Sequence, residues 1–215
     1  MLVLLRHGES RLNREGRFSG WSDTPLTPEG VAESHQAGLE LRAAGIAFDA
    51  CFTSVLSRAV DTAAIVLGEL GLSAIPVFRS WKLNERNYGI LEGLLKSDAV
   101  VRYGTAKVDA WRNSLDALPP QLADDDPRHP RFKAIYGDIP RETLPASESL
   151  RAASARVVDY YESAIRPAIA AGKRILVVSH GNPLRALIAH LSENASGPMP
   201  QLSIKNAVPL FVETI

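Results

Sequence analysis

The sequence predicts an α/β fold, a three-layer sandwich in which helices cover both faces of a mostly parallel central sheet. Short apolar runs alternate along the chain with longer stretches whose apolar positions recur at helical spacing. The runs lack the polar alternation of a half-exposed strand, which indicates strands covered on both faces. With 215 residues, 46% of them hydrophobic, the chain has enough apolar material for one core, so residues 1–215 are expected to form a single domain.

The first half of the chain alternates strand and helix. Residues 2–5 are all apolar and are expected to form the first strand. Thr27 followed by Pro28 is typical of a helix start, an N-cap with proline at the first helical position, and Gly45 is a stop. The remaining elements expected here are a strand at 50–53, a helix at 57–70 and a strand at 74–78.

The second half contains a less regular stretch. After two short helices, at 97–103 and 107–113, residues 118–145 hold six prolines and are expected to form a surface excursion or lid. Ser149 then opens a long amphipathic helix that is predicted to end near Gly172. The last elements expected are a strand at 175–178, a helix at 183–191 and a strand at 208–212.

Charge and composition exclude several classes of partner. Lys plus Arg and Asp plus Glu both total 24, so no overall field favours nucleic acid or an anionic membrane. The opening apolar run is too short for a signal peptide or a membrane span, which predicts a cytoplasmic protein. The single cysteine, Cys51, lies in an apolar stretch and is expected to be a buried thiol.

Two His-Gly pairs occur in equivalent settings. His7-Gly8 and His180-Gly181 each follow an apolar strand. Ligands of parallel sheets bind at the carboxyl ends of the strands, so the two imidazoles would face each other if their strands are neighbours. A neutral imidazole can attack phosphorus, and a second histidine, protonated or donating a hydrogen bond, can stabilise the phosphoryl oxygens during transfer.

Cationic side chains lie near both histidines. Arg6 precedes His7, and Arg58 lies at the start of the second predicted helix, where each can donate two hydrogen bonds to a phosphate. Taken singly, a histidine at a strand end is more often a structural residue than a catalyst. Metal binding is the competing interpretation, but the sequence has no His-Glu-x-x-His or Cys-x-x-Cys spacing, so no metal is expected.

Longer motifs resemble a known family. Residues 5–10 (LRHGES) and 17–21 (RFSGW) are similar to the signature of the histidine phosphatase superfamily. Residues 53–59 (TSVLSRA), 81–89 (WKLNERNYG) and 180–187 (HGNPLRAL) resemble the cofactor-dependent phosphoglycerate mutases within it. The resemblance extends from residue 2 to about residue 212 and implies a phosphoglycerate mutase-like fold.

That resemblance implies a reaction and a set of site residues. The family interconverts 3-phosphoglycerate and 2-phosphoglycerate through a phosphohistidine, with 2,3-bisphosphoglycerate as primer and without a metal. By resemblance His7 is the phosphorylated residue, Arg6, Arg58 and His180 hold the phosphoryl group, and Glu85 is the general acid and base. The substrate-binding residues that it implies are Asn13, Ser19, Gly20, Tyr88, Lys96, Arg112, Gly181 and Asn182. It also implies a homodimer or homotetramer whose only other partners are small phosphoglycerates.

Two departures from the family pattern favour an alternative function. Asn113 stands where the family has a second arginine, and we expect Lys107 or Arg102 to compensate for the missing cation. The chain also ends at Ile215, where longer members continue into a tail that helps close the site, so a wetter site with more hydrolysis is expected. The alternatives are a histidine-type phosphomonoesterase of the same superfamily and a catalytically inert scaffold, although the intact site residues argue against the scaffold.

Overall fold

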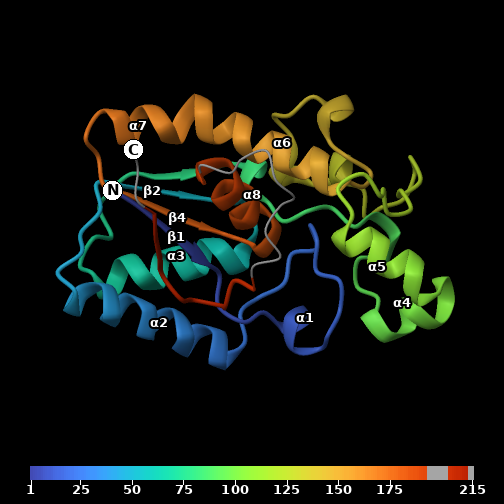
Figure 1. The fold of residues 1–215 in the computed structure, drawn as a ribbon, viewed down its shortest axis with the longest axis horizontal. Helices are drawn as coiled ribbons and strands as arrows, with labels where there is room; N and C mark the ends of the chain where they lie inside the picture. The colour runs from blue at the N-terminus through green and yellow to red at the C-terminus, as the bar shows by residue number, and fades with distance from the viewer. Residues whose placement is uncertain (193–202, 213–215) are drawn as a thin grey trace.

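The computed structural model describes residues 1–192 and 203–212. Its centre is one sheet in the order β3-β2-β4-β1-β5, in which β1 to β4 are parallel and β5 is antiparallel to β1 (Figure 1). The five strands are β1 (Leu2–Arg6), β2 (Ala50–Thr53), β3 (Val77–Arg79), β4 (Ile175–Ser179) and β5 (Leu210–Val212). The predicted α/β sandwich with a mostly parallel sheet is therefore confirmed.

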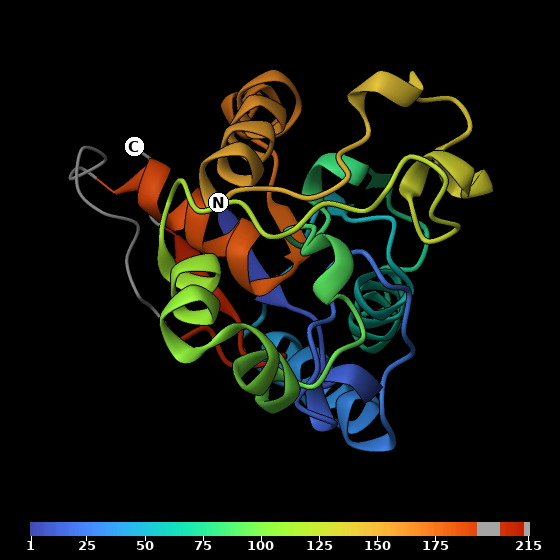
Figure 2. The same ribbon diagram turned by 90° about the vertical axis from the view of Figure 1, so that its right-hand side faces the viewer.

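Strands β1 and β4 are neighbours, and their register fixes where the chain leaves the sheet. Leu5 pairs with Val178 and Arg6 with Ser179, so the two strands end level with each other. The helices α1 (Arg11–Arg14), α4 (Lys96–Tyr103) and α5 (Thr105–Asn113) lie beyond these carboxyl ends, on the right of Figure 1. Figure 2 faces this end of the molecule, with α4 and α5 in light green and residues 118–145 in yellow.

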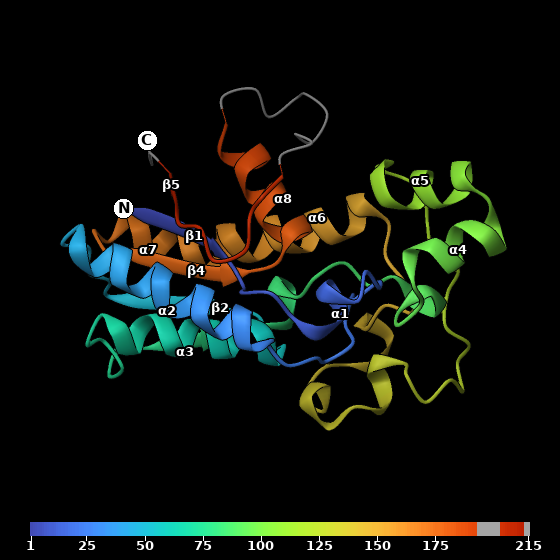
Figure 3. The same ribbon diagram turned by 90° about the horizontal axis from the view of Figure 1, so that it is seen from below.

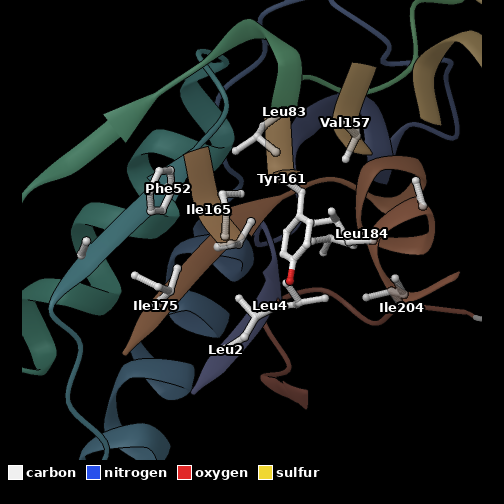
Figure 4. Close-up of a cluster of buried hydrophobic side chains, with 14 residues drawn as sticks. Leu2, Leu4, Phe52, Leu83, Val157, Tyr161, Ile165, Ile175, Leu184 and Ile204 are labelled. Atoms are coloured by element: carbon white, nitrogen blue, oxygen red, sulfur yellow. The ribbon is translucent and has the colours of Figure 1, made fainter. Parts of the chain in front are cut away.

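Helices cover both faces of the sheet. The helices α2 (Pro28–Ala43) and α3 (Ser57–Glu69) pack on one face, and α6 (Leu150–Tyr160), α7 (Arg166–Ala170) and α8 (Gly181–Leu191) on the other (Figures 1 and 3). Successive residues of β1 alternate between the two cores. Leu2 and Leu4 join the cluster under α6 to α8 that Figure 4 shows, whereas Val3 and Leu5 pack against α2 and α3.

The predicted helix starts are present with their caps. The Thr27 side chain accepts a hydrogen bond from the Gly30 amide at the start of α2, and Ser149 accepts one from Ala152 at the start of α6. The long helix predicted to end near Gly172 is instead interrupted by a π-helical turn, Tyr161–Ile165, between α6 and α7. Pro167 follows this turn and has no amide hydrogen to donate, so regular α-helical bonding cannot continue through it.

Other boundaries differ from the prediction by a few residues. The strand expected at 74–78 is β3 at Val77–Arg79, since Pro76 cannot donate to a sheet ladder. The helix expected at 183–191 begins earlier, at Gly181, and the strand expected at 208–212 is β5, Leu210–Val212. Cys51 is buried as predicted, and burial raises the pKa of its thiol to about 12.

The proline-rich residues 118–145 contain only short 3-10 turns, Pro130–Phe132, Ala134–Tyr136 and Arg141–Thr143. Tyr136 and Leu144 are buried against Trp21, so this segment packs onto the loop that follows α1. Two further 3-10 turns, Trp81–Leu83 and Gly89–Leu91, flank a stretch without regular structure. Within residues 1–192 and 203–212, no helix is long and apolar enough to cross a membrane.

Candidate active site

Two histidines lie side by side at the carboxyl end of the sheet. His7 follows β1 and His180 follows β4, and the centroids of their rings are 4.9 Å apart at an interplanar angle of 61°. Both side chains are buried, with 3% and 0% of their surface exposed. The adjacency of β1 and β4 thus brings together two residues that are 173 positions apart in the sequence.

Hydrogen bonding fixes which nitrogen of His7 is reactive. Its Nδ1 lies 2.7 Å from the carbonyl oxygen of Gly8, which can only accept, so Nδ1 carries the proton and Nε2 keeps a free lone pair. Burial lowers the pKa of His7 well below its usual value, and the positive charges of Arg58 and Arg6 lower it further. The imidazole is therefore neutral at neutral pH, as a nucleophile must be.

The loop after His7 is held closely against two helices. A Cβ on Gly8 would lie 2.2 Å from the carbonyl oxygen of Gly30 in α2, so only glycine fits there. The Gly8 amide donates to Thr62 Oγ1 of α3 at 3.1 Å, and Asn206 Nδ2 donates to the His7 carbonyl at 2.7 Å. These contacts leave the His7 backbone little freedom.

His180 has one buried ring nitrogen without a hydrogen-bond partner in the described part of the chain. Ser54 Oγ accepts from the Leu56 amide at 3.2 Å and lies 2.8 Å from His180 Nε2, so its own hydroxyl proton is free to be donated to Nε2. When the hydroxyl donates to Nε2, the ring proton is on Nδ1, which is buried and has no hydrogen-bond partner among the described residues. Burial, and then Arg58, lower the pKa of His180 well below its usual value, which favours a neutral ring over the protonated form.

Both arginines keep a buried Nε atom without a partner among the described residues. Arg58 is fully buried and donates through its terminal nitrogens to the carbonyls of Ser22 and Gly20, at 2.9 and 2.8 Å. Arg6 donates from Nη1 to the Ile204 carbonyl at 2.7 Å. The Nε atoms of both are buried without a partner in the described part of the chain. Three buried nitrogens from different elements thus lack a partner among the described residues around the two histidines, which is costly unless a ligand binds them.

Glu85 lies in the irregular stretch between the two 3-10 turns at 81–91. Its Oε1 accepts from the amide of Arg86 at 2.8 Å and from Asn182 Nδ2 at 2.9 Å. Its Oε2 lies 3.8 Å from the position of a Cβ built on Gly181, beside the loop that carries His180. One carboxylate oxygen is therefore anchored, and the other faces the start of α8.

A cleft opens next to these groups. Ten of the residues predicted from sequence line it: Arg6, Asn13, Ser19, Gly20, Glu85, Tyr88, Lys96, Arg112, Gly181 and Asn182. The other three, His7, Arg58 and His180, do not line the cleft because they are buried beside it. Asn13 accepts from the Ser10 hydroxyl at 2.9 Å and donates to Ser19 at 3.3 Å, so it ties two cleft segments together.

Sequence reasoning missed two cations of the cleft. Arg17 and Arg185 also line it, whereas Lys107 and Arg102, the expected substitutes for the absent second arginine at position 113, do not. The signal for Arg185 was its place four residues after Gly181 in a helix, which puts both on one face. The lining therefore holds five cationic side chains and one carboxylate, an environment suited to a small polyanion.

The positive charges that line the cleft repel one another. The pKa of Lys96 is lowered by its partial burial, and the neighbouring charges of Arg112 and Arg6 lower it further. A bound anion would relieve this repulsion. Among residues 1–192 and 203–212, no group of three or more His, Cys, Asp or Glu side chains could hold a metal ion.

Comparison with known proteins places the chain in a family. Residues 2–212 match the Histidine phosphatase superfamily (branch 1). The chain belongs to the histidine phosphatase superfamily. A protein of Nitratidesulfovibrio vulgaris named 2,3-bisphosphoglycerate-dependent phosphoglycerate mutase is 48% identical over 209 residues, which cover 97% of this chain and 84% of the relative. A protein of the same name from Lachnoclostridium phytofermentans is 45% identical over 212 residues, covering 99% of this chain and 85% of the relative.

The superfamily also contains phosphatases with this fold. The crystal structure of the alpha-ribazole phosphatase of Shigella flexneri superimposes with a TM-score of 0.72 and 27% identity, covering 97% of this chain and 87% of the other. The fold alone therefore does not separate mutases from phosphatases, and the distinction depends on the residues of the cleft.

Proposed function

We propose that this chain interconverts 3-phosphoglycerate and 2-phosphoglycerate through a phosphohistidine on His7. The observation that carries the proposal is the neutral His7 ring, whose Nε2 has a free lone pair, next to three buried nitrogens. These are Arg6 Nε, Arg58 Nε and His180 Nδ1, none of which has a partner within residues 1–192 and 203–212, and in the proposal all three donate. Such donors suit the oxygens of a transferring phosphoryl group. The two relatives at 45 and 48% identity support the choice of phosphoglycerates as substrates.

The chemistry needs one nucleophile and one proton carrier. His7 Nε2 attacks phosphorus, the bond to the substrate oxygen breaks, and Glu85 gives that oxygen a proton. In the return step a substrate hydroxyl attacks the phosphohistidine and gives its proton back to Glu85. His180 and the two arginines hold the charge on the phosphoryl oxygens in both directions.

The cleft fits a substrate with two anionic groups. Lys96, Arg112, Arg17 and Arg185 line the cleft together with Tyr88, and they offer donors for a carboxylate and for a phosphate that is not being transferred. The same donors suit 2,3-bisphosphoglycerate, which supplies the first phosphoryl group to His7. No metal is part of the proposal, because the cations and imidazoles provide the charge stabilisation.

The test is an isomerisation assay. Purified protein with 3-phosphoglycerate and a trace of 2,3-bisphosphoglycerate is expected to form 2-phosphoglycerate, detected by coupling to enolase. His7→Ala is expected to abolish the activity, whereas His35→Ala, at an exposed histidine bonded to Glu69, is expected to retain it. Absence of 2-phosphoglycerate with intact protein would reject the proposal.

A histidine-type phosphomonoesterase is the second candidate. It is favoured by Asn113, which is exposed and does not line the cleft, and by the phosphatase of the same fold. In that case phosphate release from varied esters would exceed isomerisation. The ratio of the two rates on 3-phosphoglycerate decides between the candidates.

The proposal includes a cytoplasmic location and a homodimer or homotetramer formed from one domain of residues 1–215. Glycolytic substrates support the location. The edge strand β3 supports self-association, because Val77 and Phe78 are 41% and 46% exposed there. Light scattering on the purified protein tests the oligomeric state.

A further inference from the structure

One guanidinium group holds the stretch that carries Glu85. Arg156, on α6, donates from Nη1 to the carbonyls of Lys82 and Asn84, at 2.8 and 2.9 Å, and from Nη2 to the carbonyl of Glu85 at 2.8 Å. No backbone amide of the described residues donates to these three carbonyls. The conformation of this stretch therefore depends on a side chain from a distant element.

Glu148 completes the arrangement. Its Oε1 accepts from Arg156 Nε at 2.6 Å and its Oε2 from Arg156 Nη2 at 2.8 Å, so the two side chains form a bidentate ion pair. Its Oε2 also accepts from the Asn87 amide at 2.9 Å. All five N–H groups of Arg156 are thus used, and only 8% and 5% of the two side chains are exposed.

We propose that the Glu148–Arg156 ion pair is a positioning device for Glu85. The pair bonds to backbone groups on both sides of Glu85, at residues 82, 84, 85 and 87, and the Trp21 indole adds a second donor to the Glu85 carbonyl at 2.6 Å. In the described part of the chain the pair makes no hydrogen bond to β1, α3 or the His180 loop, which carry the phosphoryl-binding groups. Its links to that site are indirect, through the Ser179 hydroxyl, which donates to the Leu83 carbonyl at 2.7 Å, and through the Trp21 ring, which lies 5.5 Å from the Arg156 guanidinium. Loss of the pair is therefore expected to displace the proton carrier, which it holds directly, much more than the phosphoryl site. This inference rests on the proposed role of Glu85 as general acid and base.

Two phosphoryl donors with different leaving groups can separate a displaced proton carrier from a damaged phosphoryl site. When 2,3-bisphosphoglycerate phosphorylates His7, the departing alcohol oxygen needs a proton, so the step depends on Glu85. When 2,4-dinitrophenyl phosphate does so, the phenolate leaves without a proton, and the step depends on His7, His180 and the arginines alone. A displacement of Glu85 by about 1 Å is expected to lower the rate of His7 phosphorylation on the order of a hundredfold with 2,3-bisphosphoglycerate, but not with the dinitrophenyl ester.

The variant is Arg156→Lys, which keeps the buried positive charge but cannot form the fork. We expect its rate of His7 phosphorylation, measured as a pre-steady-state burst, to fall about a hundredfold with 2,3-bisphosphoglycerate and less than about threefold with the dinitrophenyl ester. Glu85→Gln should show the same selectivity. Glu148→Gln is a nearly isosteric second variant, to be used if Arg156→Lys does not fold.

A matched control is available at the other end of the sheet. Arg174 makes a bidentate pair with Asp49, at 2.8 and 3.0 Å, just before β4 and β2 begin. Arg174→Lys should leave both phosphorylation rates unchanged. Equal losses with the two phosphoryl donors in Arg156→Lys, or no loss with either, would overturn the inference. If the intact protein instead fails to phosphorylate His7 with any donor, the proposed function itself is wrong.

Discussion

At the scale of single residues, the tautomer of His180 depends on one hydroxyl group. Ser54 Oγ accepts from the Leu56 amide and lies 2.8 Å from His180 Nε2, where a donated hydroxyl proton keeps the ring proton on Nδ1. In Ser54→Ala the ring can place its proton on either nitrogen, so Nδ1 is a donor only part of the time. We expect kcat for isomerisation to fall about tenfold with little change in KM, because the lost bond is made in the transition state.

The Ser54→Ala prediction has a spectroscopic measurement besides the kinetics. Nitrogen chemical shifts of the His180 ring report which nitrogen carries the proton, and they should change in the variant. Ser163→Ala removes a hydroxyl that bonds only to backbone carbonyls on the protein surface and serves as the control. An unchanged tautomer together with an unchanged kcat would show that Ser54 does not orient His180.

Arg185 is the second residue whose role can be isolated. It lines the cleft and bonds to Asn182 Oδ1, which places its charge near Glu85 and the start of α8. In Arg185→Met we expect KM for 3-phosphoglycerate to rise roughly ten- to a hundredfold, as for the loss of one charge-assisted bond of about 1.5–3 kcal/mol. Lys107→Met, outside the cleft, should leave KM unchanged. Equal KM values in the two variants would remove Arg185 from the substrate site.

At the scale of elements, the first turn of α2 sets the position of the loop that carries His7. A Cβ on Gly30 would lie 2.0 Å from the carbonyl oxygen of Glu9, so the helix and the loop touch backbone to backbone. Gly30→Ala must push the two apart. We expect it to lower the free energy of unfolding by about 1–3 kcal/mol and to lower kcat, measured by urea titration and by the isomerisation assay.

Gly68→Ala is the matched control for that helix contact. Gly68 lies in α3 and is exposed, and a Cβ there would meet nothing within 4 Å. Alanine should therefore raise the free energy of unfolding by about 0.5–1 kcal/mol through its higher helix propensity, with kcat unchanged. Opposite signs of the two stability changes are the expected result, and a loss of stability in both would contradict the contact argument.

The elements also show which local features a sequence reveals. Thr27-Pro28 and Ser149 predict helix starts because a cap acts within one turn of itself. The π-helical turn at Tyr161–Ile165 was not predicted, since the apolar spacing on both sides of it is helical and only Pro167 signals an interruption. The position of residues 118–145 was not predicted either, because prolines exclude regular structure without indicating where the chain packs.

At the scale of the whole molecule, the site depends on how distant segments meet. The pairing of His7 with His180 could be predicted, because equivalent strand ends in a parallel sheet meet at one edge. The role of Arg156, which holds the Glu85 stretch, could not be predicted, since a charged residue on a long helix is expected to be exposed to solvent unless its buried partners are known. Its five hydrogen bonds exist only in the folded chain.

Burial of both histidines as neutral rings makes the stability of the whole molecule depend on pH. Burial, with Arg58 as the next cause, lowers the pKa of His7 and of His180 in the folded state, whereas both titrate near pH 6.5 in the unfolded chain. Below that pH the unfolded chain binds protons that the folded chain does not, so acid favours unfolding. Each ring should lower the free energy of unfolding by up to about 1.4 kcal/mol for each pH unit between pH 6.5 and 5.5. Between pH 7 and 8 neither ring should change it. In His180→Gln, the free energy of unfolding measured by urea titration should fall less steeply with falling pH than in the parent protein, by up to that amount. If the two proteins show the same dependence on pH, His180 is not buried as a neutral ring.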